Sequence, residues 1–171
     1  MRYDSIHGRF PLGNTVNANS IALGRGPIDV VSTYVHSKMD WSDFYVVLEC
    51  TGRINNGRDS AAYIKQGAKV VLISAPAKNI NKTVVYNFNH KDLVQSDTII
   101  SNSSCTTKCL EPVLKVLNDA LRINFEMMTT IHSYAGDRPT LDRRYDDINR
   151  ARAAAMSIIQ PQRVQLKRLE K

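Results

Sequence analysis

The chain has 171 residues, 43% of them hydrophobic and 23% charged, which is ordinary for a globular protein large enough to bury a core. No apolar run is long enough to span a bilayer and the N-terminus lacks a signal-peptide pattern, so we expect a cytoplasmic protein with no membrane partner. Of the formal net charge of +7, residues 160–171 carry +3, and the remaining +4 is spread over 159 residues. Because the positive charge outside residues 160–171 is spread thinly along the chain, we expect no specific nucleic-acid partner.

The N-terminal part of the chain predicts short strands. Alternating segments before residue 26 indicate edge strands and turns, and residues 28–35 favour a further strand. Residues 43–52 form a short, continuous apolar run, which is typical of a parallel strand buried on both faces. Cys50 ends the apolar run, so its side chain is expected to be buried.

A helix and a second buried strand follow. The helix is expected to begin near Asn56 or Asp59 and to end at Gly67. Residues 69–76 then form a β-branched run closed by a proline. Strand, helix and strand in about thirty residues predict a right-handed βαβ unit with parallel strands.

The carboxyl ends of these two strands are the expected ligand edge of the sheet. They carry Thr51 and Gly52 after the first strand and Ser74 after the second. From the residues alone, Thr51-Gly52 is equally well described as an ordinary strand-ending turn.

Beyond residue 104 the pattern becomes helical. Ser103 or Ser104 is suited to cap the helix N-terminus, which places Cys105 in the first turn. Apolar residues at three- and four-residue spacing form a single stripe along this helix: Cys109, Leu110, Val113, Leu114, Val116, Leu117, Ala120 and Leu121.

A thiol at a helix N-terminus is a candidate nucleophile because the helix dipole and the free backbone amides favour the thiolate. Residues 125–134 predict a strand that carries His132, and an imidazole beside Cys105 would complete a catalytic pair. Spacing alone leaves open both this pair and an inert cysteine. The three cysteines are an odd number, which favours free thiols, and no zinc-like spacing predicts a metal site.

A family resemblance decides between these interpretations. The segment 101–119, SNSSCTTKCLEPVLKVLND, resembles the active-site segment of phosphorylating glyceraldehyde-3-phosphate dehydrogenases, whose usual form is S-N-A-S-C-T-T-N-C-L-A-P. Further matching segments run in the same order through residues 2–159: RYDSIHGRF, VVLECTG, GAKVVLISAP, TVVYNFNHKDL, MTTIHSY and LDRRYDDINRARAAAMSII. The related erythrose-4-phosphate dehydrogenases share the cysteine motif and are the alternative, although GDRPTLDRR is more similar to the glyceraldehyde enzyme.

The resemblance implies a role for each matching residue. Cys105 would attack the aldehyde of glyceraldehyde 3-phosphate, and His132 would act as the base. Ser104 and Thr106 match positions that hold inorganic phosphate, and Asp137 matches one that lines the substrate phosphate site. From the residues alone, Thr106 could equally well just support the helix cap.

The resemblance also implies a cofactor and an assembly. Thr51, Gly52 and Ser74 match positions beside NAD, with NADP as the alternative cofactor. Residues 133–150 match a long loop that reaches a neighbouring subunit in a homotetramer, and residues 146–159 are expected to lead back into the core.

The chain departs from the family pattern in several places. No G-x-G-x-x-G follows a strand, so the family's opening βαβ unit and its acidic ribose-binding residue are not represented. Ala135 stands where the family has a substrate-binding threonine, which removes a hydrogen bond of about 1.5–3 kcal/mol. Lys108 replaces the usual asparagine of the cysteine motif.

Residues 160–171, QPQRVQLKRLEK, are expected to be a frameshifted tail. One choice of synonymous codons for this segment, read one base earlier, encodes PTTTGAAKAVGK, which is how the family continues after SII. The basic character of the tail then needs no function.

Together these features predict an α/β fold: a partial Rossmann-like parallel sheet followed by the start of an α+β catalytic domain, both incomplete. Residues 1–104 would be the remnant of the NAD-binding domain, 105–159 the first part of the catalytic domain and 160–171 the shifted tail. We expect a glycolytic dehydrogenase fragment that is inactive and poorly folded alone because its sheet edges and apolar faces are uncovered. A complementing fragment without catalysis and a basic nucleic-acid binder are the alternatives.

Overall fold

The computed structural model describes residues 3–4, 8–10, 15–23, 26–33, 35–136, 138–145 and 147–158. The predicted tail at 160–171 and Asp137 lie outside the described residues. Within them, no helix is long and apolar enough to cross a membrane.

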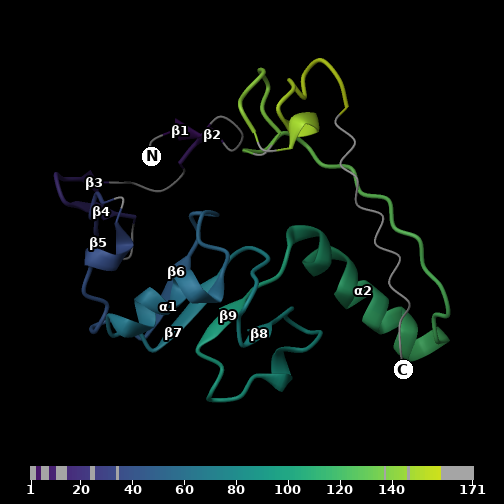
Figure 1. The fold of residues 1–171 in the computed structure, drawn as a ribbon, viewed down its shortest axis with the longest axis horizontal. Coiled ribbons are helices and arrows are strands. Elements are labelled where there is room, and N and C mark those ends of the chain that lie inside the picture. Colours follow the sequence, from purple (N-terminus) through teal and green to yellow (C-terminus); the bar gives the residue numbers. More distant parts are fainter. Residues whose placement is uncertain are drawn as a thin grey trace.

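The centre of the molecule is a four-stranded parallel sheet in the order β6-β7-β9-β8 (Figure 1). Its strands are β6 (Val46–Glu49), β7 (Val70–Ile73), β8 (Lys82–Thr83) and β9 (Ile99–Ser101). Leu48 of β6 pairs with Leu72 of β7, and Leu72 pairs in turn with Ile100 of β9. The predicted α/β class and its parallel βαβ unit are confirmed.

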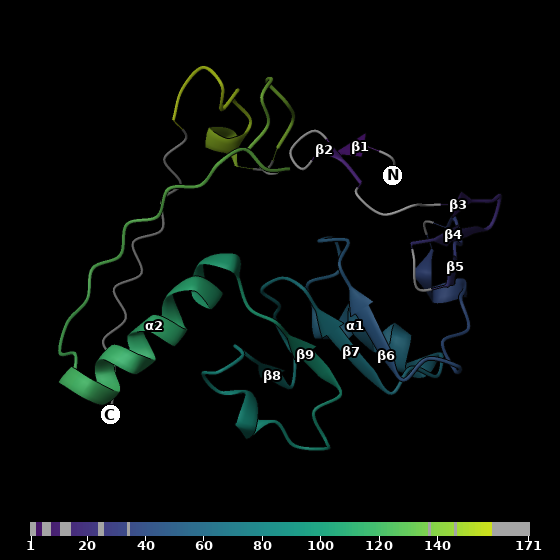
Figure 2. The ribbon, with the colours of Figure 1, turned by 180° about the vertical axis from the view of Figure 1, so that it is seen from behind.

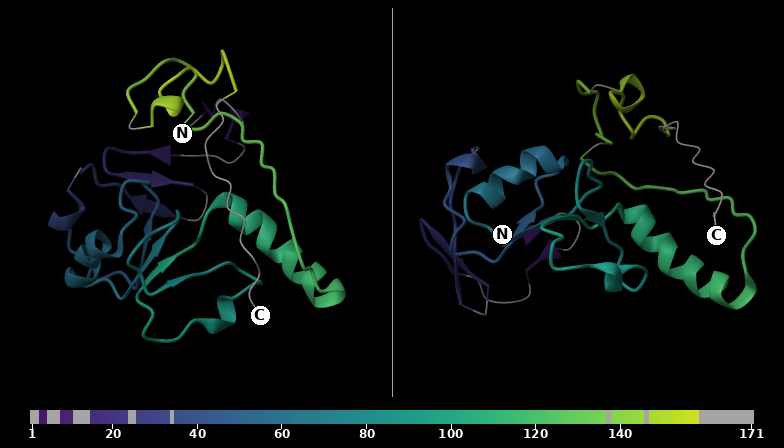
Figure 3. Two further views of the ribbon diagram at one scale, coloured as in Figure 1. Left: turned by 45° about the vertical axis from the view of Figure 1, so that its right-hand side comes forward. Right: turned by 60° about the horizontal axis from the view of Figure 1, so that its bottom comes forward.

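Helix α1 (Gly57–Lys65) connects β6 to β7 and covers one face of the sheet (Figures 1 and 3). The side chain of Asn56 accepts a hydrogen bond from Arg58 N at 3.0 Å, and Gly67 follows the helix at a φ of +108°. Both predicted ends are therefore confirmed, with Asn56 rather than Asp59 as the cap. The core lies between this helix and the sheet and contains Val47, Tyr63, Ala68, Val71 and Ile73.

The opposite face of β6 is open. Val46 is 46% exposed and Leu48 63%, whereas Val47 and Glu49 point toward α1 and are buried. The prediction that this strand is buried on both faces was wrong, because no described segment covers the second face. Cys50 is exposed rather than buried, since it follows the inward-facing Glu49 and successive strand residues point to opposite sides.

Smaller antiparallel sheets precede the central sheet (Figure 2). Strands β1 (Tyr3–Asp4) and β2 (Gly8–Arg9) form a hairpin, and β3 (Thr15–Val16), β4 (Ser20–Ala22) and β5 (Pro27–Asp29) form a second sheet. The early edge strands are thus confirmed. The strand predicted over 28–35 is wrong in length: β5 ends at Asp29, which pairs with Ser20, the first residue of its antiparallel partner β4.

Helix α2 (Cys105–Leu121) follows β9 and projects away from the sheet (Figures 1 and 3). Its apolar stripe is present but has no covering layer in the described structure: Val113, Val116, Leu117 and Leu121 are 42–74% exposed. The short 3-10 helices are η1 (His36–Lys38), η2 (His90–Asp92) and η3 (Ile148–Arg150).

The strand predicted over 125–134 is wrong. These residues are extended but belong to none of the sheets, because no described segment pairs with them. The expectation that 146–159 returns to the core was also wrong for most of the described residues there. Ala153 is buried, but Ile148, Met156 and Ile158 are at least 78% exposed.

Because α1 packs closely against the loop after β7, a single methyl group added at Gly57 is expected to lower the stability of the fold. A Cβ on Gly57 would lie 1.7 Å from the carbonyl oxygen of Asn79, whereas one on Gly136 would meet nothing within 4 Å. We expect Gly57→Ala to lower the free energy of unfolding by about 1–3 kcal/mol, because a backbone must move. Gly136→Ala should change it by less than about 0.5 kcal/mol. Urea unfolding followed by Trp41 emission measures both, and equal stability of the two variants would contradict the docked position of α1.

Candidate functional site

The connection from β9 to α2 fixes the position of Cys105. Ser104 caps the helix: its Oγ accepts a hydrogen bond from Thr107 N at 3.0 Å and lies 2.7 Å from Thr107 Oγ1. Cys105 is the first helical residue and its side chain is exposed. Of the two predicted caps, Ser103 and Ser104, Ser104 is the one observed, and the prediction that Cys105 lies in the first turn is confirmed.

The start of α2 is suited to an anion. The first N–H groups of a helix have no intrahelical partner, and the helix dipole is positive at this end. The sulfur of Cys105 lies 3.9 Å from Thr106 Oγ1, so a hydroxyl is adjacent to the thiol. A negative charge held at this end of the helix is therefore stabilised.

The residue before the cap has an unusual backbone. Ser103 is buried and has a φ of +59°, in the left-handed region that non-glycine residues rarely adopt. Such a conformation costs about 1–3 kcal/mol and persists only when neighbouring groups hold it. Sequence reasoning missed this feature, since a serine carries no signal for left-handed backbone.

The neighbouring strand ends carry the predicted cofactor residues. Because β6, β7 and β9 are parallel, their carboxyl ends share one edge of the sheet. Thr51 and Ser74 are exposed at this edge, and Ser74 N donates to the backbone oxygen of Glu49 at 2.9 Å. Gly52 has a φ of +70°, and nothing lies within 4 Å of the position that a Cβ would take.

A buried carboxylate organises the end of β6. Glu49 is 2% exposed, and its side chain accepts hydrogen bonds from Thr51 N at 2.7 Å, from the Thr51 hydroxyl and from the Tyr63 hydroxyl of α1. Burial acts to raise the pKa of Glu49, but these hydrogen bonds, together with nearby His36, outweigh it and lower the pKa below its ordinary value. Glu49 is thus a buried anion that fixes the Thr51 turn.

Tyr63 completes this polar contact inside the core. It packs against His36 and Trp41, with ring centroids 4.7 and 5.4 Å away. Burial raises the pKa of Tyr63, as do the hydrogen bond to Glu49 and the charge of Glu49. The sequence contained a signal for this pair, because Glu49 interrupts an otherwise apolar strand.

His132 does not contact Cys105 in this structure. Its Nε2 atom lies 3.2 Å from Thr130 Oγ1, both in the extended segment after α2. Within the described residues no hydrogen bond joins the two predicted catalytic side chains. The chain that follows α2 turns back at the end of that helix and continues as an extended segment separate from it (Figures 1 and 2).

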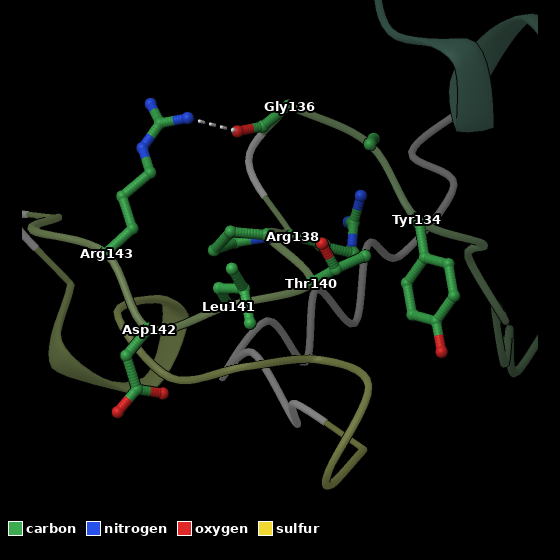
Figure 4. A pocket seen from close by; sticks show the side chains of 9 residues that line it. Tyr134, Gly136, Arg138, Thr140, Leu141, Asp142 and Arg143 are labelled. Atoms are coloured by element: carbon green, nitrogen blue, oxygen red, sulfur yellow. Dashed lines mark hydrogen bonds between the residues drawn. The ribbon is translucent and has the colours of Figure 1, made fainter. Parts of the chain in front are cut away.

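The loop after His132 forms a hollow of about 540 Å³ (Figure 4). It is lined by residues 134–136 and 138–143, and Arg143 Nη1 donates to the backbone oxygen of Gly136 at 3.4 Å. Ala135 is one of the lining residues and is exposed, and its backbone oxygen accepts a hydrogen bond from Arg138 N. None of the strand-end residues or Cys105 lines this hollow. Among the described residues no His, Cys, Asp and Glu gather as a metal site.

The order of these elements matches one family of proteins. The sequence model for the glyceraldehyde 3-phosphate dehydrogenase C-terminal domain matches residues 104–167. Glyceraldehyde-3-phosphate dehydrogenase from Cereibacter sphaeroides is 48% identical over 159 residues, which are 93% of this chain and 48% of that protein. The protein of the same name from Xanthobacter flavus is 49% identical over 160 residues, which are 92% of this chain and 48% of that relative.

The chain belongs to the glyceraldehyde-3-phosphate dehydrogenase family. It spans about half the length of the curated relatives that it matches, including that of Clostridium acetobutylicum at 44% identity. The family match begins at Ser104, the cap of α2, and extends eight residues into the segment predicted as a shifted tail. The domain boundaries at 104 and 159 remain predictions.

The buried carboxylate predicts a pH-dependent stability. Because the pKa of Glu49 is lowered on folding, its contribution is present above the unfolded value of about 4.5 and is lost as the pH falls through the folded value. We expect Glu49→Gln to destabilise the chain by about 1.5–3 kcal/mol at pH 7, the range for hydrogen bonds to a charged group, and by less at acid pH.

Urea titrations followed by Trp41 emission at several pH values measure this difference. The exposed carboxylate of Asp43, just before β6, provides the control, since Asp43→Asn removes an equal charge without a buried hydrogen bond. A Glu49→Gln difference that stays constant with pH would show that the carboxylate is not the stabilising group.

Proposed function

We propose that Cys105 is the nucleophile of an NAD-dependent, phosphorylating oxidation of glyceraldehyde 3-phosphate. The observation that carries the proposal is the position of Cys105 at the start of α2, directly after a strand of a parallel sheet whose other carboxyl ends present Thr51, Gly52 and Ser74. Membership of the glyceraldehyde-3-phosphate dehydrogenase family supports the reaction class and a nicotinamide cofactor.

The residues at the helix start fit the first chemical step. The thiolate of Cys105 attacks the aldehyde carbon, a C–S bond forms, and the carbonyl electron pair moves to oxygen. The first-turn N–H groups and the helix dipole stabilise the negative charge on that oxygen. His132 is the proposed base: it takes the proton from the Cys105 thiol before the attack, returns it to the oxyanion and takes it up again as the hydride leaves.

The strand ends fit a dinucleotide. Gly52 is in the left-handed region with open space at its Cβ position, so a ligand can approach the backbone closely. We infer that Thr51, Gly52 and Ser74 hold NAD or NADP, with Glu49 fixing the Thr51 turn. When bound, the cofactor would supply the hydride acceptor that turns the Cys105 adduct into a thioester.

Phosphate completes the reaction. Inorganic phosphate attacks the thioester carbon, and the sulfur of Cys105 leaves as the thiolate that the helix start stabilises. Ser104 and Thr106 are the proposed phosphate contacts, because they flank Cys105, one as the cap of α2 and the other in its first turn. Asp137 is proposed for the substrate phosphate, and assembly into a homotetramer remains part of the proposal.

The separation of Cys105 and His132 limits the catalysis that the isolated chain can carry out. With His132 held beside Thr130 rather than beside the sulfur, the base cannot take up the proton. We therefore propose that this chain alone does not turn over substrate, and that it carries its catalytic residues for a larger assembly.

A chimera tests the proposed reaction. Residues 2–159 of this chain replace the matching segment of the Cereibacter sphaeroides enzyme, and reduction of NAD is followed with glyceraldehyde 3-phosphate and phosphate. We expect the chimera to be active. Cys105→Ser should lower its kcat by about a thousandfold or more, because a serine hydroxyl is a much weaker nucleophile than a thiolate and would form the covalent adduct far more slowly.

The matched control is Cys109→Ser, which alters an exposed thiol one turn further along the same helix. It should retain activity within about threefold. The isolated 171-residue chain is assayed in parallel and should produce no NADH. Equal activity of Cys105→Ser and Cys109→Ser would refute Cys105 as the nucleophile, and turnover by the isolated chain would refute its proposed dependence on a larger assembly.

A further inference from the structure

Ser101 is a fully buried hydroxyl between the two halves of the proposed site. It is the last residue of β9, its side chain is 0% exposed, and no role in the reaction assigned above uses it. Its Oγ donates a hydrogen bond to the backbone oxygen of Ala75 at 2.7 Å and accepts one from Ser103 N at 3.0 Å.

These two bonds connect the segment after β7 to the turn before α2. Ala75 directly follows Ser74, one of the proposed cofactor residues, and Ser103 is two residues before Cys105. The bonded Ser103 is the residue with the left-handed backbone. The Ser101 hydroxyl therefore links the segment that carries the proposed cofactor residue Ser74 to the turn that positions the proposed nucleophile Cys105.

Backbone bonds hold the rest of the turn to the sheet. Asn102 N donates to the Ile73 oxygen at 2.8 Å, and Val84 N donates to the Ser101 oxygen at 2.8 Å. These bonds would survive the loss of the Ser101 side chain. The Ser103 N–H, by contrast, would lose the acceptor that holds the left-handed conformation.

We propose that Ser101 is a positioning residue for Cys105, tying the end of β7 to the left-handed turn that begins α2. The proposal rests on the proposed function, in which Cys105 is the nucleophile. Ser101 itself touches no reacting atom. Its effect is to keep the sulfur over the helix start and at a fixed place relative to Ser74.

The test compares the reactivity of two thiols within one molecule. Iodoacetamide alkylates a thiolate by forming an S–C bond with release of iodide, and peptide mass spectrometry measures the rate separately at Cys105 and Cys109. In the full chain we expect Cys105 to react faster than Cys109, which lies beyond the first turn. Equal rates in the parent chain would refute the nucleophile assignment, and with it the proposed function.

Ser101→Ala should lower the ratio of the Cys105 rate to the Cys109 rate by about fivefold, the factor expected from one lost hydrogen bond. Ser60→Ala is the matched control, because Ser60 is equally buried but its hydroxyl has no hydrogen-bond partner in the described structure. That variant should leave the ratio unchanged.

A second substitution separates positioning from general stability. Glycine adopts a left-handed backbone without strain, so Ser103→Gly added to Ser101→Ala should restore at least about half of the lost ratio. Trp41 emission should be the same in all variants, since the proposed effect is confined to the turn. An unchanged ratio in Ser101→Ala, an equal fall in Ser60→Ala, no restoration by Ser103→Gly, or a shift of Trp41 emission in Ser101→Ala would each overturn the proposal.

Discussion

The hydrogen-bond register of three parallel strands determines where every group of the proposed site lies. Leu48, Leu72 and Ile100 are aligned across β6, β7 and β9, so the next residues of each strand reach the same edge together. Thr51, Ser74 and the turn before Cys105 follow from this alignment. A shift of one register position would turn the alternating side chains over and would place Glu49 on the open face instead of against α1.

Hydrogen bonds to buried polar groups then hold the loops that follow these strands in one conformation. Glu49 bonds the Thr51 turn and Tyr63, while Ser101 bonds Ala75 and Ser103. A buried charge or hydroxyl is tolerated only with such partners, because desolvation is costly. The hydrogen bonds that give these buried groups their partners also fix the loops at the edge of the sheet where the ligands are proposed to bind. The fold and the proposed chemistry therefore depend on the same few residues.

Sequence patterns predicted the elements whose causes are local. The cap at Ser104, the helix limits at Asn56 and Gly67 and the two β-branched strands depend on residues close to them in the chain, and all were confirmed. The strand at 125–134 was not, because a strand needs a partner that no described residue provides. The left-handed Ser103 and the inward-facing Glu49 depend on contacts between distant segments, so a pattern search could not place them. The proposed Cys105–His132 pair stays a prediction for the same reason.

Amide hydrogen exchange on the 171-residue chain measures the central claim most directly, namely that the sheet edge holds the start of α2 in place. Residues 99–104 include β9, which is hydrogen-bonded to β7 and β8, and the amides of Asn102 and Ser103, which donate to Ile73 O and Ser101 Oγ. They should exchange at least about a hundredfold more slowly than residues 123–134, whose extended backbone belongs to no sheet. Exchange of residues 99–104 as fast as that of residues 123–134 would contradict it.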